Sequence, residues 1–123
     1  MNPLFFGLVV LVDLKAATLK VDHPEFQLDT PVIVGKDATP TPPGIYSLNR
    51  AHSSRLGMDI LVFIKDGQEI WAIHPNIRSR ARQLATPTPA DNALSNGCIG
   101  IDAAAFDQLW QTDHELVLQV YNP

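Results

Sequence analysis

The chain has 123 residues, a length typical of one domain, and we expect residues 1–123 to fold as a single unit. Its 46% hydrophobic and 18% charged content is typical of a protein with a packed core rather than a disordered one. A net charge of −4 argues against a nucleic-acid-binding surface, which is normally basic. One cysteine cannot form an internal disulfide, and its spacing from the four histidines does not match a zinc site.

The chain begins with an apolar stretch, "PLFFGLVVLV" at 3–12, which has the length of the apolar part of a signal peptide. It is too short to span a membrane as a helix, and no Lys or Arg precedes it. Cleavage after Ala17 would also remove much of the first expected hairpin. We therefore expect a buried first strand rather than a cleaved signal.

Most of the chain has the pattern of short strands separated by turns. Two β-rich runs within 59–75 flank Asp66-Gly67, the residue pair that type I′ hairpin turns prefer. A strand at 30–36 ends at Gly35, and the other expected strands cover 9–14, 18–21, 44–50 and 114–121. The first two of these lie close enough in the sequence to pair as a hairpin.

One helix is expected after Asp102, which can serve as its N-cap. Phe106, Leu109 and Trp110 follow at helical spacing, and a weaker second helix is expected at 77–85. Together, the expected strands and helices predict a mainly β domain with one or two short helices, built as a sheet packed on a sheet or as a partly closed barrel.

The pentapeptide "ATPTP" occurs twice, at 38–42 and 85–89. The surroundings of the two copies do not match, so we do not interpret them as a structural repeat. Proline fixes its own φ angle and keeps the preceding residue out of the helical region. Both copies are therefore expected to be stiff, extended segments.

The cysteine lies in the stretch "SNGCIG" at 95–100. Gly97 and Gly100 allow a tight turn and a close approach to a ligand, and the expected helix begins a few residues later. Backbone N–H groups of this loop could bind an oxyanion. Two interpretations remain open for Cys98: an activated nucleophile, or an inert buried thiol.

A base for such a thiol is available in His74. It ends the predicted strand "EIWAIHP", and Pro75 stops the strand directly after it, which would place the ring at the rim of a pocket. His52, in the polar loop at 50–57, is the competing candidate. The alternative for His74 is a surface or strand-end histidine without a chemical role.

Three stretches together resemble the L,D-transpeptidase (YkuD-type) catalytic domain family. They are "PVIVGKDATPTPPGIYSL" at 31–48, "IHP" at 73–75 and "SNGCIGI" at 95–101. The resemblance runs over about 31–111, and the first expected hairpin also matches the opening strands of the family. It implies a β-sandwich-like domain and a cysteine acyltransferase that acts on peptidoglycan stem peptides, with no metal and no cofactor.

In the family, the thiolate attacks the diamino acid carbonyl of a stem tetrapeptide and releases the terminal D-alanine. An amine acceptor then gives a 3→3 cross-link, water gives L,D-carboxypeptidase trimming, and a free D-amino acid gives exchange. The resemblance implies that Cys98 is the nucleophile and His74 the base. Gly97 with Cys98 would supply the backbone donors to the oxyanion, and Ser95 would support the loop.

The sequence departs from the family pattern at three positions. Asn96 replaces the motif histidine, Gly100 replaces an Arg or Asn, and Pro75 replaces a glycine after His74. Asn96 can still hydrogen-bond near a substrate, but it cannot titrate. Gly100 cannot contact a substrate carboxylate through a side chain.

Arginines elsewhere in the chain could supply the missing carboxylate contact. We hypothesise that one of Arg78, Arg80 and Arg82 does so, the alternative being that they form a solvated surface. The loop at 50–57 carries two further arginines, Arg50 and Arg55.

Three functions therefore remain under consideration: an active peptidoglycan enzyme, a degenerate peptidoglycan-binding module without turnover, and an unrelated small β domain with a structural role. The implied substrate lies outside the cytoplasmic membrane, so the cell envelope or periplasm is the expected location. Unconventional export, delivery into another cell as a wall-attacking effector and release by a phage all remain open. The sequence predicts no particular protein partner.

Overall fold

The computed structural model describes residues 7–36, 38–75, 93–95 and 97–123. This part of the chain contains nine strands and one helix, α2 (Ala103–Gln111). The strands are β1 (Leu8–Asp13), β2 (Thr18–His23), β3 (Phe26–Gly35), β4 (Gly44–Ser53), β5 (Met58–Lys65), β6 (Gln68–Pro75), β7 (Ala93–Ser95), β8 (Ile99–Ile101) and β9 (Leu116–Tyr121). The predicted mainly β fold is confirmed.

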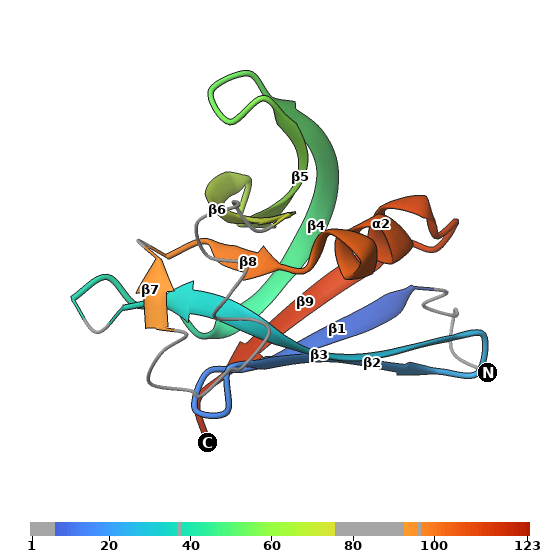
Figure 1. Ribbon diagram of the computed structural model, residues 1–123, viewed down its shortest axis with the longest axis horizontal. Helices are drawn as coiled ribbons and strands as arrows, with labels where there is room; N and C mark the ends of the chain where they lie inside the picture. The colour runs from blue at the N-terminus through green and yellow to red at the C-terminus, as the bar shows by residue number, and fades with distance from the viewer. Residues whose placement is uncertain (1–6, 37, 76–92, 96) are drawn as a thin grey trace.

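The strands form one sheet that closes on itself. Neighbouring strands follow the order β2-β1-β9-β4-β5-β6-β8-β3-β7, and a further pairing of β2 with β3 joins the ends of the first eight. Figure 1 shows the resulting sandwich-like arrangement, with the β1, β2 and β3 ribbons below and the β4–β5 hairpin rising away from them. Closure leaves few strand edges without a hydrogen-bonding partner.

The core lies inside the closed sheet and depends on alternation along each strand. Leu8 and Val10 of β1 are fully buried, and they lie beside Leu116 and Leu118 of the parallel strand β9. Burial of each such side chain contributes about 1.5–3 kcal/mol to folding. Residues 8–13 are therefore the expected buried strand, held between β2 and β9.

Local signals in the sequence are confirmed at the main hairpin and at the helix. Asp66 and Gly67 both have positive φ angles, 53° and 77°, as a type I′ turn requires. The Asp102 carboxylate accepts hydrogen bonds from Ala104 N–H at 3.0 Å and Ala105 N–H at 3.3 Å, so it is the N-cap of α2. The weaker helix predicted at 77–85 lies outside the described residues.

Two parts of the sheet differ from the predicted elements. Strand β3 begins at Phe26 rather than near residue 30, because it pairs with β2 from His23↔Phe26 to Thr18↔Pro31. The short strands β7 and β8 were not predicted at all. Three residues are too few to show a period of two, and all three residues of β8 are buried.

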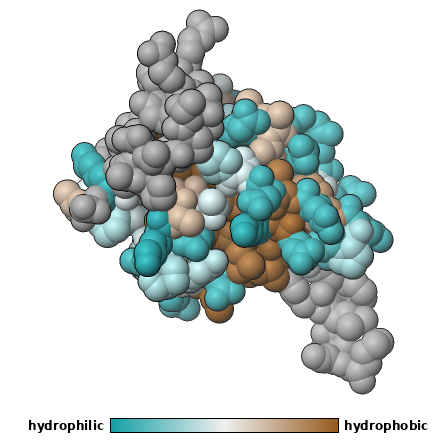
Figure 2. Space-filling model, turned by 60° about the horizontal axis from the view of Figure 1, so that its bottom comes forward, coloured by the Kyte–Doolittle hydropathy of each residue, from teal (hydrophilic) through white to brown (hydrophobic). Residues whose placement is uncertain are grey.

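Figure 2 shows one face of the molecule, on which hydrophilic side chains border an area of apolar side chains.

No helix in the described ranges is both long enough and apolar enough to cross a membrane.

Candidate active site

Cys98 lies between β7 and β8, and it is partly exposed to solvent. The two isoleucines of β8, Ile99 and Ile101, are fully buried in the core. Side chains alternate along a strand, so Gly100 is on the outer face, and Cys98, one residue before β8, continues onto that face. The thiol is therefore neither enclosed in the core nor remote from solvent.

His74 is brought to the same face by the neighbouring strand. Strands β6 and β8 run parallel, with Ile73 beside Ile99 and His74 beside Gly100. Because Ile73 is fully buried, His74 points outward, as Cys98 does. Position 100 adds no side chain to this face, since it is a glycine.

The orientation of the His74 ring is fixed by its own strand end. Its Nδ1 lies 2.8 Å from the carbonyl oxygen of Pro75. A carbonyl oxygen can only accept a hydrogen bond, so Nδ1 carries the proton and donates it. In the neutral ring, Nε2 then carries the lone pair, which is the form that a general base requires.

The backbone before the cysteine is anchored by a buried hydroxyl group. Thr41 is fully buried, and its Oγ1 accepts a hydrogen bond from Gly35 N–H at 2.9 Å. The same hydroxyl donates to the carbonyl oxygen of Gly97 at 2.9 Å. In a trans peptide the N–H is opposite to the C=O, so the Cys98 N–H is directed away from Thr41.

Two glycines make this arrangement possible. A Cβ at Gly35 would overlap the main-chain atoms of residues 39–41, which pass directly over it. Gly97 has a φ of 131°, and a Cβ there would overlap the indole ring of Trp71. Gly35 thus lets the segment that carries Thr41 pass close to β3, and Gly97 allows Trp71 to pack against the cysteine loop.

A pocket of about 230 Å³ opens at Cys98. Trp71, which is 39% exposed, and the buried Ala72 contribute to its wall from β6. Arg55 and Leu56 contribute from the β4–β5 turn, and Glu69 from the start of β6. His74 is two residues beyond Ala72 on the same strand face, but it is not itself one of the lining residues.

The remaining predicted residues fall into two groups. Ser95 ends β7, where it pairs with Gly35 of β3. Asn96, Arg78, Arg80 and Arg82 lie outside the described residues, so their roles stay predictions. The competing histidine, His52, forms an exposed pair with Asp59 at 3.0 Å and does not line the cysteine pocket.

Sequence reasoning missed Thr41 and Trp71. The sequence predicts stiff, extended "ATPTP" segments, but it assigns no role to the hydroxyl group of Thr41 within the first copy. Thr41 contacts a residue 56 positions away in the sequence. No local pattern in the sequence indicates that contact.

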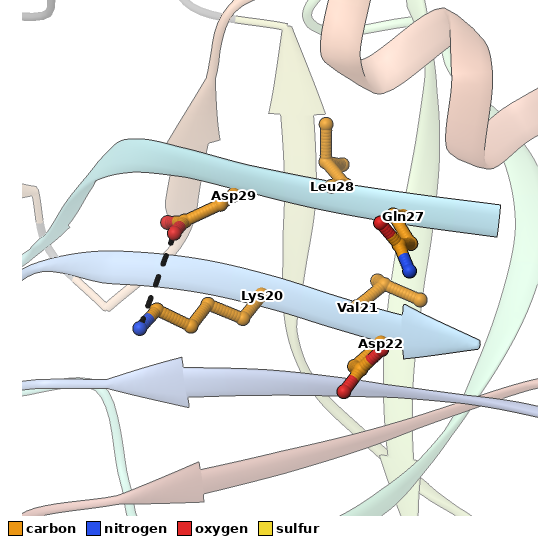
Figure 3. Close-up of a pocket in the computed structure, with 6 residues that line it drawn as sticks. All are labelled: Lys20, Val21, Asp22, Gln27, Leu28 and Asp29. Atoms are coloured by element: carbon orange, nitrogen blue, oxygen red, sulfur yellow. Dashed lines mark ion pairs between the residues drawn. The ribbon is translucent and has the colours of Figure 1, made fainter. Parts of the chain in front are cut away.

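A second pocket, of about 360 Å³, lies over β2 and β3 (Figure 3). Its charged side chains include Lys20 and Asp29, which form an ion pair at 4.0 Å and are 59% and 69% exposed. It contains neither a cysteine nor a histidine. Nor does any group of three or more His, Cys, Asp or Glu residues in the described ranges form a candidate metal site.

Comparison with known proteins assigns the family. A family model described as "L,D-transpeptidase catalytic domain" (YkuD) matches residues 7–114. The chain belongs to the L,D-transpeptidase (YkuD) catalytic-domain family. Among curated proteins, no sequence relative is found.

Solved L,D-transpeptidase structures share the fold. One from Mycobacterium tuberculosis H37Rv has a TM-score of 0.68 at 17% identity, over 94% of this chain and 58% of that one. A mutant L,D-transpeptidase from Enterococcus faecium also has a TM-score of 0.68, at 18% identity, over 97% and 51%. The chain thus spans little more than half the length of these proteins.

The isolated catalytic domain of the E. faecium L,D-transpeptidase is closer in size. It has a TM-score of 0.63 at 18% identity, and the match covers 94% of this chain and 98% of that domain. At such identities the likeness concerns the fold alone. The resemblance to the L,D-transpeptidase family and the predicted β-sandwich-like fold are confirmed.

Proposed function

We propose that this domain is a cysteine-dependent acyltransferase that acts on the L,D bond of peptidoglycan stem tetrapeptides. One observation carries the proposal: a partly exposed cysteine lines a pocket, on the same sheet face as a histidine whose tautomer leaves Nε2 available as a base. Membership of an acyltransferase family supports the same class of reaction.

In the first half-reaction, His74 Nε2 takes the proton of the Cys98 thiol. The thiolate attacks the diamino acid carbonyl, and the Cys98 backbone N–H, oriented through Thr41 and Gly97, stabilises the oxyanion. The C–N bond to D-alanine then breaks. The His74 imidazolium returns its proton to the leaving amine, D-alanine departs, and the acyl group remains on Sγ as a thioester.

In the second half-reaction, His74 takes a proton from the incoming acceptor, which attacks the thioester. An amine of a second stem peptide gives a 3→3 cross-link, water gives a tripeptide, and a free D-amino acid gives the exchanged tetrapeptide. Each route breaks the C–S bond and returns the proton to the Cys98 sulfur. The acceptor therefore decides between cross-linking, L,D-carboxypeptidase trimming and exchange.

A binding module without turnover is the second candidate. The sequence favours it at two positions, because Asn96 and Gly100 replace the family's histidine and its Arg or Asn. Under this alternative the pocket would hold a stem peptide, but Cys98 would not be activated.

The substrate implies where the domain acts. Peptidoglycan lies outside the cytoplasmic membrane, so we propose the cell envelope as its location, either on the cell's own wall or as a delivered wall-attacking effector.

The test uses purified protein mixed with disaccharide-tetrapeptide from Gram-negative wall, with mass spectrometry of the products. Wild type should give 3→3 dimers, loss of one D-alanine or mass exchange with an added D-amino acid. Cys98→Ala should give none of these. If both proteins leave the tetrapeptide intact, the catalytic proposal is wrong.

Thiol labelling separates the two candidate functions. An activated Cys98 should react with iodoacetamide near neutral pH much faster than a free thiol does. A rate equal to that of free cysteine, together with retention of the protein on purified wall, would favour the binding module.

A further inference from the structure

The pocket at Cys98 contains two charged side chains of opposite sign on different elements. Arg55 comes from the β4–β5 turn and Glu69 from the start of β6. No ion pair within 4.0 Å joins either of them to another described residue. Within the described part of the chain, neither charge is neutralised by an ion pair, and the same pocket is lined by the buried side chains of Val62 and Ala72.

Arg55 is presented by a turn that is itself hydrogen-bonded. The Ser53 hydroxyl accepts from Leu56 N–H at 3.1 Å, and the Ser53 carbonyl accepts from Gly57 N–H at 2.8 Å. Gly57 ends the turn with a φ of 67°, and Leu56 lines the pocket beside Arg55. Arg55 thus extends from a defined backbone rather than from an unstructured tip.

The other arginine of this hairpin has a different role. Arg50 Nε donates to the Trp110 carbonyl oxygen at 2.9 Å, and its Nη2 donates to that of Thr112 at 2.7 Å. These carbonyls end α2, so Arg50 stabilises the C-terminus of the helix. Of these two arginines, Arg55 is the one that lines the cysteine pocket.

Glu69 reaches the pocket through an irregularity in the sheet. The β5–β6 register shifts between Phe63, which pairs with Trp71, and Ile64, which pairs with Glu69. Ile70 is therefore the extra residue of a bulge. Four consecutive residues, 69–72, line one pocket. In a regular strand, successive side chains point to opposite faces of the sheet, whereas the extra residue of a bulge brings neighbouring side chains to the same side.

We propose that Arg55 binds the terminal D-alanine carboxylate of the donor tetrapeptide and that Glu69 binds the side-chain ammonium of its diamino acid. This inference rests on the proposed function, since it concerns the same pocket. The attacked carbonyl has these two substrate charges on its two sides, and the pocket offers one charge of each opposite sign beside Cys98. Arg55 thereby supplies the carboxylate contact that Gly100 cannot make.

The test pairs each variant with a substrate that lacks the matching charge. The natural tetrapeptide is compared with one whose C-terminus is a carboxamide and with one whose side-chain amine is acetylated. Wild type should prefer the natural peptide over either modified peptide by about tenfold or more in kcat/KM. Arg55→Gln should abolish only the preference for the carboxylate, and Glu69→Gln only the preference for the free amine.

Two further variants serve as controls. Arg55→Lys, which keeps the positive charge but cannot form a bidentate pair of hydrogen bonds with a carboxylate, should retain part of the carboxylate preference. Lys15→Gln, which removes an exposed positive charge from the turn between β1 and β2, should behave as wild type. An equal loss by Arg55→Gln on the carboxylate and carboxamide peptides would overturn the assignment of Arg55. No loss on any peptide would overturn it as well.

Binding to Cys98→Ala by calorimetry distinguishes this inference from the proposed function. If Cys98→Ala prefers the carboxylate peptide through Arg55 while wild type turns nothing over, the subsite stands and catalysis fails. If wild type is active but the carboxylate preference persists in Arg55→Gln, the catalytic proposal stands and the assignment of Arg55 to the carboxylate fails. Loss of the preference in Arg78→Gln, Arg80→Gln or Arg82→Gln instead would transfer the role to that residue.

Discussion

The cysteine pocket and the pocket over β2–β3 differ in how their polar groups are held. At β2–β3, the exposed side chains of Lys20 and Asp29 form an ion pair with each other (Figure 3). A charged ligand would have to replace this pair, and exposed ion pairs contribute little binding free energy. At Cys98, a fully buried Thr41 hydroxyl fixes the backbone, while Arg55 and Glu69 have no ion-pair partner among the described residues. The pocket over β2–β3 is larger, but it is the weaker candidate site, because it contains neither a cysteine nor a histidine and two of its charged side chains already pair with each other.

The largest expected contrast between the two pockets comes from removing the thiol. Cys98→Ala should lower kcat/KM for tetrapeptide by about 10⁴-fold or more, because no other group can form the thioester. The double variant Lys20→Gln/Asp29→Asn should stay within about twofold of wild type. Turnover assays on both proteins check this, and comparable losses in the two would remove the distinction between the pockets.

Next in size is the effect of a methyl group at the turn before the cysteine. Gly97→Ala should lower activity by about a hundredfold, because φ is 131° and the new Cβ would overlap Trp71. Adding Trp71→Ala should restore only part of the activity, since the backbone strain persists.

Gly67→Ala is the matched control for that strain. Its φ of 77° is also unfavourable for alanine, but no atom lies within 4 Å of the added Cβ. This variant should lose stability without losing turnover per folded molecule, as measured by thermal unfolding beside the activity assay. Equal activity losses at positions 67 and 97 would indicate a general folding effect.

The buried hydroxyl beneath the cysteine loop gives an intermediate effect. Thr41→Val leaves the Gly35 N–H and the Gly97 carbonyl without this partner, which should cost about 1–3 kcal/mol of unfolding free energy. Because the oriented Cys98 N–H acts on the oxyanion, kcat should fall about tenfold and KM much less. Thr41→Ser, which keeps the hydroxyl, should recover most of kcat, and a valine variant with wild-type kcat would contradict the positioning role.

A smaller effect is expected at Tyr46, whose hydroxyl donates to the Pro42 carbonyl at 2.6 Å and so holds the segment that follows Thr41. Tyr46→Phe should cost about 1 kcal/mol near neutral pH. Burial raises the pKa of Tyr46 above its usual value of 10.0. The folded state therefore holds this proton more tightly than the unfolded state.

The sign of the pH dependence follows from that shift. The contribution of Tyr46 is complete below the unfolded-state pKa and is lost as pH rises through the higher folded-state pKa. Urea unfolding from about pH 8 to pH 11 should show a fall in stability that Tyr46→Phe reduces. An identical fall in the Tyr46→Phe protein would contradict this assignment.

The smallest effect belongs to the ion pair of the β2–β3 pocket. A double-mutant cycle on Lys20→Gln and Asp29→Asn should give a coupling free energy below about 0.5 kcal/mol, because both side chains are exposed. Chemical denaturation of the four proteins measures it. A coupling well above 1 kcal/mol would mean that this pocket is more rigidly built than its exposure indicates.

The sequence by itself determined most of the local structure. Alternation identified the long strands, Asp66-Gly67 identified the hairpin turn, and Asp102 identified the start of the helix. These signals depend on neighbours within a few residues, so they persist without the rest of the fold. The three family-like stretches also identified the family, and they indicated Cys98 as the candidate nucleophile and His74 as the candidate base.

Only the tertiary structure decided which distant residues meet at the cysteine. Two arginines of one hairpin look alike in the sequence, but Arg50 binds the end of α2, whereas Arg55 lines the pocket. Thr41 contacts Gly97 across 56 residues, and a bulge directs Glu69 to the same face as Ala72. Such contacts follow from strand order and register, which depend on how the whole closed sheet buries its core.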